Sequence, residues 1–423
     1  MVTTETEISS SSARALTLAA YVSFVPIGIA TVLLGPMLPT LSSRWSLDYA
    51  QAGALFNAQY VGSICGVALS GWMASRWGFR TTMKVGLVLI SAAVALLLAG
   101  PMAMGIACIA GSGAGMGIAI PAANLLVADA NPERRSATLN LLNVCWSGGA
   151  VACPFLVAMA SKTGHVPQFL ICVAGISLLI ALGIASMPAS IVEPVMTSHQ
   201  APVIPLIRNK PLAFAILSAL FLLYVGVENG FGQWMATYAK SLGTLTLAMA
   251  LATPSFFYAA LAAGRWLAPL LLRVAGEVTL VRLGLLLSCA GMAGLVFSRG
   301  LAGVMASACA AGFGLSYVYP ITIALLSKEF GSARIGSFMF LLSNFSGGIL
   351  PWIVGVCSTR SGTLKAGLLV PLLGCAAMFA LYLGNWTQIS VEPPSDSVGR
   401  AHRLGSDEPG SKAGEAYHSI ERK

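Results

Sequence analysis

One acidic residue differs from the others in this chain because it lies deep inside a long apolar stretch. Glu228 precedes Lys240 by 12 residues, which places it roughly 18 Å from that end of a helix at about 1.5 Å per residue. An ionised carboxylate is costly at such a depth, so this side chain is a candidate for binding and releasing a proton. The alternative is a neutral Glu that hydrogen-bonds to a neighbouring helix.

Counting residues from the ends of the apolar stretches places no basic residue at the depth of Glu228. The nearest is Arg265, which falls in the last third of its own apolar stretch. Burying an anion normally requires a basic partner that offsets its desolvation. The sequence therefore predicts a neutral or cationic ligand, and it argues against phosphate, nitrate and organic dianions.

Amide and aromatic side chains make up much of the remaining polar inventory of the apolar stretches. An amide donates and accepts hydrogen bonds at once, which suits vicinal hydroxyl groups, and a Trp ring offers a flat apolar face with an N–H at its edge. A single intramembrane amide is more often a hydrogen bond between helices. As a set, the candidates for binding a solute are Tyr21, Asn57, Gln59, Asn143, Trp146, Asn229, Gln233, Trp234, Tyr319 and Asn344.

The elements that must position these residues are membrane-spanning helices. Of the 423 residues, 57% are hydrophobic and 9% are charged, whereas soluble domains carry roughly 25% charged residues. The composition excludes an ordinary soluble enzyme and a disordered chain. Twelve spans of suitable length are predicted at 15–40, 49–74, 84–101, 103–128, 138–160, 166–188, 211–239, 245–272, 277–298, 301–327, 333–358 and 363–385.

The distribution of basic residues predicts the orientation of these spans. If both termini are cytoplasmic, the cytoplasmic segments hold 18 Lys and Arg and the other side holds 6, as the positive-inside rule requires. We therefore expect a multi-pass protein of the cytoplasmic (plasma or inner) membrane, and the net charge of +9 needs no nucleic-acid partner. The first 13 residues lack the basic start of a signal peptide, so the first span is expected to remain as an anchor.

An internal repeat divides the chain. At an offset of 199, Gly113, Pro121 and Arg135 match Gly312, Pro320 and Arg334. Two six-span halves in the same orientation are one repeat plan of secondary transporters, so the predicted fold is an all-α polytopic membrane protein with twelve transmembrane helices in two six-helix pseudo-repeats. The predicted regions are a cytoplasmic N-terminal segment (1–14), the first half (15–188), a cytoplasmic linker (189–210), the second half (211–386) and a disordered cytoplasmic tail (387–423).

The loop after the second span carries a recognisable motif. It reads Gly71-Trp-Met-Ala-Ser75-Arg76-Trp-Gly78-Phe-Arg80, which resembles the G-x-L-A-D-R-x-G-R-R signature of the major facilitator superfamily. The resemblance implies a gating loop in which Gly71 lets two helices approach and basic residues hold the cytoplasmic end; the candidates are Gly71, Ser75, Arg76, Gly78 and Arg80. Ser75 replaces the Asp of that family, so its charge latch is absent or weakened here. The alternative for Arg76 and Arg80 is that they are plain positive-inside residues.

A narrower resemblance comes from the seventh span. The segment 224–238, together with 131–135 and 139–143, is similar to the fucose/glucose–proton symporter branch of that superfamily. The resemblance implies hexose uptake driven by protons. Fucose-transporting members of the branch use acids in spans 1 and 4, and this chain has none in the interior of either.

These observations predict a secondary transporter that works by alternating access, with proton-coupled uptake of a neutral sugar or similar small solute. The alternative is a proton-antiporting exporter of hydrophobic or cationic compounds, for which the 16 Met could form an adaptable pocket. An enzyme is not expected, because all four His lie in loops or the tail, and a channel does not call for two matched halves. We expect no metal site, no cofactor beyond the proton gradient, and a chain that functions as a monomer in the lipid bilayer.

Overall fold

The computed structural model describes residues 2–186, 207–208, 210–330 and 333–384, and within these ranges all regular elements are helices. The predicted tail at 387–423 lies outside the described residues, as does nearly all of the predicted linker at 189–210. Those two regions therefore stay predictions.

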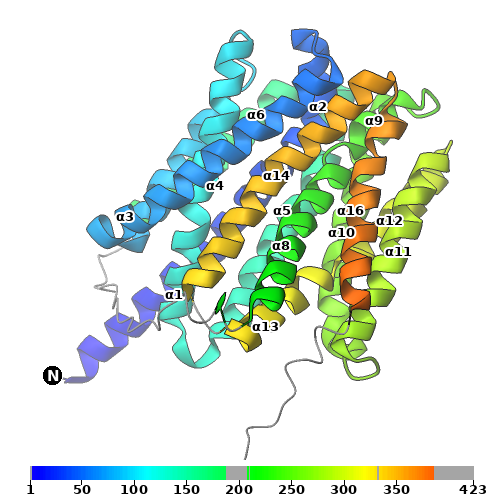
Figure 1. The fold of residues 1–423 in the computed structure, drawn as a ribbon. Coiled ribbons are helices and arrows are strands. Elements are labelled where there is room, and N and C mark those ends of the chain that lie inside the picture. The colour runs from blue at the N-terminus through cyan, green and yellow to red at the C-terminus, as the bar shows by residue number, and fades with distance from the viewer. Residues whose placement is uncertain (1, 187–206, 209, 331–332, 385–423) are drawn as a thin grey trace, which may run out of the picture. The chain divides into compact units, whose positions relative to one another are not determined.

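The described residues form two sets of helices (Figure 1). The first half contains α1 (Val2–Val32), α2 (Leu34–Trp45), α3 (Tyr49–Leu96), α4 (Met102–Ala130), the short 3-10 helix η1 (Pro132–Arg134), α5 (Arg135–Thr163) and α6 (Val166–Ser186). The second half contains α8 (Pro211–Gly232), α9 (Met235–Ser241), α10 (Leu247–Leu271), α11 (Glu277–Phe297), α12 (Leu301–Leu315), α13 (Val318–Phe330), α14 (Ala333–Ser361), α15 (Leu364–Gly367) and α16 (Leu369–Leu383).

The number of membrane-spanning segments agrees with the sequence. Eleven helical segments of the described residues are long and apolar enough to cross a membrane, and one of them, α3, has 48 residues and is long enough to cross twice. The all-α polytopic fold with twelve spans is thus confirmed. Below, "N-terminal end" means the end of the bundle where α1 begins, and "opposite end" means the end that α2 reaches at Trp45; both can be followed in Figure 1.

The predicted loop between the second and third spans is a bend within one helix. Gly78 has φ +78° in the middle of α3, where the backbone leaves helical geometry for one residue. Glycine reaches this left-handed region without a steric penalty. The helix resumes at once, so the helix that carries the third span begins at Phe79, ahead of the predicted start of the span at residue 84.

The first span of each half is interrupted at a matching place. The chain turns at Leu33 between α1 and α2, where Pro36 lacks the N–H that would bond to the carbonyl of Val32. In the second half the chain turns at Gln233 and Trp234, between α8 and α9. The two turns are 200 residues apart, close to the repeat offset, and both lie beside the cavity described below.

Equivalent glycines let equivalent helices approach in the two halves. A Cβ at Gly86 would lie 2.6 Å from the carbonyl oxygen of Gly115, which places α3 against α4. In the second half a Cβ at Gly284 would lie 2.5 Å from the carbonyl oxygen of Gly314, which places α11 against α12. The sequence repeat therefore marks the same helix contact in both halves.

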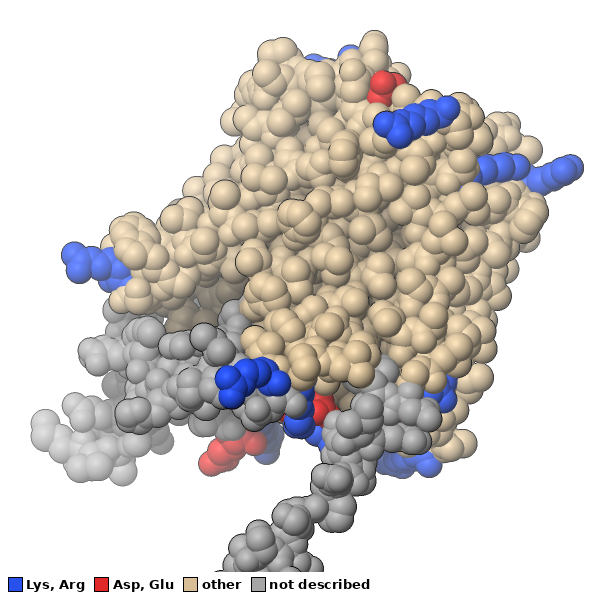
Figure 2. Space-filling view, in the orientation of Figure 1, with Lys and Arg blue, Asp and Glu red and all other residues tan. Residues whose placement is uncertain are grey.

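The surface of the bundle is typical of a protein surrounded by lipid. Lys and Arg gather toward the two ends of the visible face, and the area between them carries no charged side chain (Figure 2). Large apolar side chains such as Leu179, Trp266 and Phe297 are well exposed, as expected where hydrocarbon replaces water.

Candidate substrate cavity

A cavity of about 300 Å³ lies between the two halves and is lined by both. The first half lines it from α1, α3, α4 and α5, and the second half from α8, α10, α13 and α14. Its side chains are amides, hydroxyls and aromatic rings around a single carboxylate and a single guanidinium. The polar and aromatic members are Phe24, Thr31, Gln59, Tyr60, Ser63, Asn124, Asn143, Trp146, Tyr224, Glu228, Asn229, Tyr258, Arg265, Tyr319, Phe340, Ser343 and Asn344.

The carboxylate and the guanidinium face each other. Arg265 Nη2 lies 3.9 Å from Glu228 Oε2 and donates a hydrogen bond to Tyr224 Oη at 3.2 Å. The Tyr224 ring stacks on Tyr319 with centroids 5.1 Å apart and planes at 25°. Tyr224 and Glu228 are four residues apart on α8, so both point to the same side of that helix.

The prediction that no basic residue reaches the depth of Glu228 is wrong. It was based on counting residues from the helix ends, whereas the long arginine side chain extends well beyond its own backbone position. Arg265 is 27% exposed and Glu228 is 13% exposed, so both are largely sheltered. The argument against an anionic ligand, which depended on the absence of a basic residue, loses its basis.

Glu228 and six of the ten predicted solute-binding residues line this cavity: Gln59, Asn143, Trp146, Asn229, Tyr319 and Asn344. Asn124, Asn143, Asn229 and Asn344 each donate one amide hydrogen bond to the carbonyl four residues earlier in their own helix, at 2.8–3.0 Å. This shared arrangement fixes each amide while leaving its second N–H outside the helix. The Asn344 Oδ1 accepts from Ser63 at 3.1 Å, so this amide also joins the two halves.

The other four predicted residues lie outside the cavity lining. Tyr21 is on α1 nearer the N-terminal end, and Asn57 lies where α3 packs against Gly348 of α14. Gln233 and Trp234 are almost fully buried at the turn between α8 and α9. Solute binding by these four is therefore not supported by their positions.

Several lining residues were not among the candidates, namely Tyr60, Tyr224, Tyr258 and Arg265. A signal for two of them is present in the sequence. Tyr258 and Arg265 are seven residues apart, about two helical turns, which puts them on one face of α10. Tyr60 carries no comparable pattern.

The cavity is closed toward the opposite end by residues around the two helix interruptions, which we call the opposite-end seal: Gly35, Tyr49, Phe56, Gln233 and Trp234. The Gln233 amide donates to Thr31 O at 3.4 Å across the two halves. Trp234 donates to Pro351 O at 2.8 Å and packs against the rings of Tyr49 and Phe56, with centroids 6.2 and 6.1 Å away.

Other contacts between the halves lie at cavity level or nearer the opposite end. Ala50 N donates to Thr359 Oγ1 at 2.8 Å, and Ser255 Oγ donates to Val151 O at 2.8 Å. Ser63 Oγ donates to Asn344 Oδ1 at cavity level, and the rings of Phe155 and Phe256 meet with centroids 5.7 Å apart. The structure therefore shows the halves held together at the opposite end.

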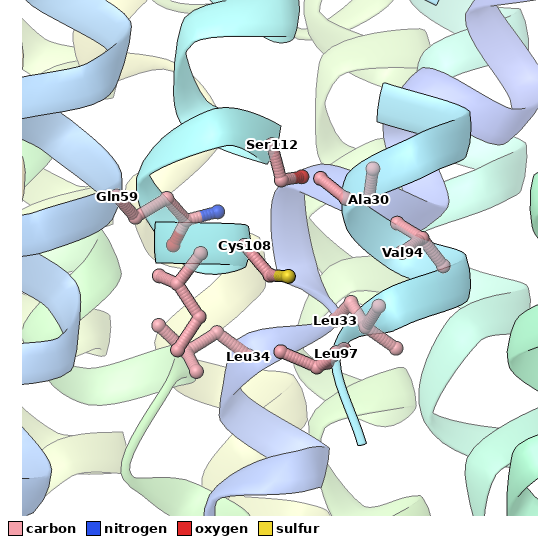
Figure 3. A pocket seen from close by; sticks show the side chains of 10 residues that line it. Ala30, Leu33, Leu34, Gln59, Val94, Leu97, Cys108 and Ser112 are labelled. Atoms are coloured by element: carbon pink, nitrogen blue, oxygen red, sulfur yellow. The ribbon is translucent and has the colours of Figure 1, made fainter. Parts of the chain in front are cut away.

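A second, much smaller hollow of about 20 Å³ adjoins the cavity at Gln59. In Figure 3 the amide of Gln59, the thiol of Cys108 and the hydroxyl of Ser112 surround this space. The Gln59 Nε2 donates to Thr31 O at 3.4 Å, whereas its Oε1 is buried with no hydrogen-bond partner among the described residues. The hollow has room for about one water molecule.

The residues of the loop motif differ in what they contact: some make only local contacts, and one bonds to a distant helix. Ser75 Oγ donates to Trp72 O at 2.8 Å, Arg76 is exposed, and a Cβ at Gly71 would meet no atom within 4 Å. The expectation that Gly71 permits a close helix approach is therefore wrong, because no other helix lies against the side of α3 on which a Cβ of Gly71 would stand. Arg80 donates to Ile184 O and Ala185 O at 2.9 and 2.8 Å, and so completes the end of α6.

Arg282 makes a similar contact in the second half, where its Nε donates to Tyr382 O near the end of α16 at 2.8 Å. Cationic side chains at helix C-termini satisfy free carbonyls and favour the helix dipole. Arg80 and Arg282 thus each bond to carbonyl groups at the end of the last helix of their own half.

A family model described as Major Facilitator Superfamily matches residues 20–356. The chain belongs to this superfamily. It is a transporter and not an enzyme, as the sequence predicted. The residues that line the cavity and the motif loop at 71–80 all lie within the matched range, so the assignment covers the whole site.

Individual members of the superfamily are similar to the chain at low identity. The 4-hydroxybenzoate transporter PcaK of Pseudomonas putida is 31% identical over 114 residues, which cover 26% of this chain and 25% of that protein. The chain thus matches only about a quarter of this relative's length.

Two solved structures share the fold over nearly the whole chain. A D-xylose–proton symporter has a TM-score of 0.70 at 17% identity and covers 87% of this chain and 96% of its own. The transporter FucP in the outward conformation has a TM-score of 0.58 at 19% identity, with 87% and 97% covered. These likenesses establish the fold.

Proposed function

We propose that this protein takes up a small hydroxylated ring compound together with protons, with sugars as the first candidates, and that it works by alternating access. The observation that carries the proposal is the position of Glu228, the one carboxylate among the residues that line a cavity shared by both halves. Because both halves line the cavity, a movement of one against the other would expose its contents to each side in turn. The proton gradient supplies the energy, and no cofactor is needed.

Glu228 is suited to carry the proton because its protonation changes the net charge of the cavity. When ionised, it offsets the charge of Arg265 at 3.9 Å. When protonated, it leaves the guanidinium without an opposite charge in a sheltered space, where electrostatic interactions are stronger than in water. A proton on Glu228 therefore alters which ligand the cavity accepts.

The lining supports a hydroxylated solute. Four Asn side chains and Gln59 offer donors and acceptors, and Trp146 and Tyr319 offer flat ring surfaces. The volume of about 300 Å³ is at the lower end of the range for small-molecule pockets, roughly 300–1,000 Å³. The relatives named above, a D-xylose–proton symporter and a 4-hydroxybenzoate transporter, are in keeping with a small ring compound.

We place the protein in the plasma or inner membrane. Its N-terminal end faces the cytoplasm, because the excess of Lys and Arg at that end predicts this orientation. In that orientation the opposite-end seal closes the cavity toward the outside. We also expect the monomer to be the functional unit, since one chain supplies both halves of the cavity.

Export of hydrophobic or cationic compounds remains the competing function. Two features of the cavity count against it. Arg265 repels a cationic ligand, and Met116 is the only Met of the described residues that lines the cavity. A cavity that adapts to many apolar compounds would use more methionine.

The test is the Glu228→Gln variant in proteoliposomes, with uptake of labelled sugars measured in two ways. We expect the variant to exchange labelled for unlabelled solute across the membrane, because the amide imitates the protonated carboxyl. We expect it to lose accumulation against a gradient when a pH gradient is imposed. If the variant accumulates solute as the parent does, Glu228 does not carry the proton and the proposal fails.

A further inference from the structure

The hydrogen-bonding capacity of Arg265 is mostly unused. A guanidinium has five N–H donors, and the described residues supply one hydrogen bond, from Nη2 to Tyr224 Oη at 3.2 Å. The Nε atom is buried and has no hydrogen-bond partner among the described residues. The Glu228 carboxylate at 3.9 Å is beyond hydrogen-bond distance of Nη2.

In the part of the chain that the structure describes, the cavity lining provides no charge for Arg265 other than Glu228. Its titratable lining groups are Glu228 on α8, Arg265 itself on α10, and four tyrosines. The tyrosines are Tyr60 on α3, Tyr224 on α8, Tyr258 on α10 and Tyr319 on α13. The lining residues from α1, α4, α5 and α14 are uncharged. Only Glu228 and Arg265 therefore set the net charge, which is zero when both are ionised.

We propose that the solute carries one carboxylate, which binds Arg265 in place of Glu228 once Glu228 has taken up its proton. This inference rests on the proposed function, because it uses Glu228 as the proton carrier. A carboxylate can accept two parallel hydrogen bonds from a guanidinium, and Nε is the donor left without a partner. The amides and aromatic rings listed above then surround the remaining, hydroxylated part of the solute.

The charge balance explains why proton and solute move together. The empty cavity holds an ionised Glu228 and Arg265 and is neutral. The loaded cavity holds a protonated Glu228, Arg265 and the carboxylate, and is neutral as well. A carboxylate without a proton leaves one net negative charge, and a proton without a carboxylate leaves one net positive charge; both are costly inside the membrane. Each ligand thereby favours binding of the other.

The same balance predicts that uptake is electroneutral. One proton and one carboxylate enter together, so no net charge crosses the membrane. A proton with a neutral sugar would instead carry one positive charge, and a membrane potential of about 100 mV would bias that movement by up to about fiftyfold.

The experiment compares ring compounds that differ only in the carboxylate: glucose with glucuronate, galactose with galacturonate, and 3,4-dihydroxybenzyl alcohol with 3,4-dihydroxybenzoate. Purified protein in dye-loaded proteoliposomes receives each compound from outside, with and without a potassium diffusion potential. We expect at least one acid to acidify the interior faster than its neutral partner, at a rate that the potential does not change. Faster proton entry with the neutral partners, or acid-driven entry that rises with the potential, would overturn the inference.

Ligand binding is measured separately, by the shift in melting temperature of the detergent-solubilised protein. We expect an acid to stabilise the protein more strongly at mildly acidic than at mildly alkaline pH. Arg265→Gln should weaken acid binding roughly tenfold to hundredfold, whereas Arg265→Lys should retain part of it. Because Arg265→Gln leaves Glu228 without its partner, the double variant Glu228→Gln, Arg265→Gln serves as a neutral control for folding, and it should no longer prefer an acid to its neutral partner.

The two proposals fail in different ways. Acid binding that depends on Arg265 but moves no protons would contradict the proposed function and support the role of Arg265. Proton entry with glucose alone would support the proposed function and contradict the carboxylate. If none of the three acids binds more tightly than its neutral partner, the inference is wrong.

Discussion

Replacing Gly35 with alanine should weaken the closure of the opposite end. A Cβ at this position would lie 2.9 Å from both Cα and the carbonyl oxygen of Gln233, and closer still to the Gln233 side-chain oxygen. Two of these atoms belong to the backbone, so a rotamer change cannot relieve the contact. Helix α2 must instead move away from the turn between α8 and α9 by about 0.5 Å to reach ordinary contact distance.

The size of the effect follows from the cost of overpacking. Such insertions typically cost about 1–3 kcal/mol. The cost arises only while the two halves touch, since Gly35 and Gln233 belong to different halves. At a factor of ten for each 1.4 kcal/mol, the closed state should become roughly 5- to 150-fold less populated relative to the open one. The gain in helix propensity from Gly to Ala is the same in both states and cancels.

The assay uses a cysteine pair at Ala50 and Thr359 in a chain whose nine native Cys have been replaced. These positions meet at the opposite end, with Ala50 N 2.8 Å from Thr359 Oγ1. Oxidative cross-linking should be slower with Gly35→Ala, by about fivefold or more where the open state predominates and by less where the closed state predominates. Gly175→Ala is the matched control, because its Cβ meets nothing within 4 Å. If Gly35→Ala cross-links as fast as Gly175→Ala, the contact with Gln233 does not control closure.

Two further predictions concern stability, measured as thermal or denaturant unfolding in detergent. Trp234→Phe removes the donor to Pro351 O at 2.8 Å inside the opposite-end seal and should lower the free energy of unfolding by about 1–3 kcal/mol. The control Trp72→Phe changes a side chain that is 57% exposed and should be nearly neutral. Equal effects of the two variants would show that the hydrogen bond is unimportant. Arg80→Ala removes two hydrogen bonds to the end of α6 and should lower the free energy of unfolding by about 1–3 kcal/mol. The control Arg76→Ala, at an exposed position, should change it by no more than about 0.5 kcal/mol. A larger loss with Arg76→Ala than with Arg80→Ala would contradict the structural assignment of the loop.

The fold could be predicted from the sequence because long apolar spans and their repeat are local, additive signals. A stretch of about 20 apolar residues has few alternatives to a membrane helix, and the matched glycines 86 and 284 mark the same helix contact in each half. The bend at Gly78 was visible as a motif, but its φ value, and hence the immediate restart of the helix, depends on tertiary packing.

The site could be predicted only in part, because the direction in which a side chain points and the depth that it reaches depend on tertiary structure. Glu228 was identified since a lone acid in an apolar span is conspicuous. Arg265 was placed too far away because residue counting ignores the reach of its side chain. Trp234 and Gln233 looked like solute ligands by residue type, yet the turn between α8 and α9 directs them into the contact between the halves.

The most direct test of the account is the internal pH of dye-loaded proteoliposomes when a hydroxylated ring compound is added from outside. The account predicts that the interior becomes acidic with the parent protein and that Glu228→Gln abolishes this response while solute exchange continues. An alkaline response that occurs only with hydrophobic cations would contradict the account and identify an exporter. Solute accumulation without any proton movement would show that the cavity does not couple the two.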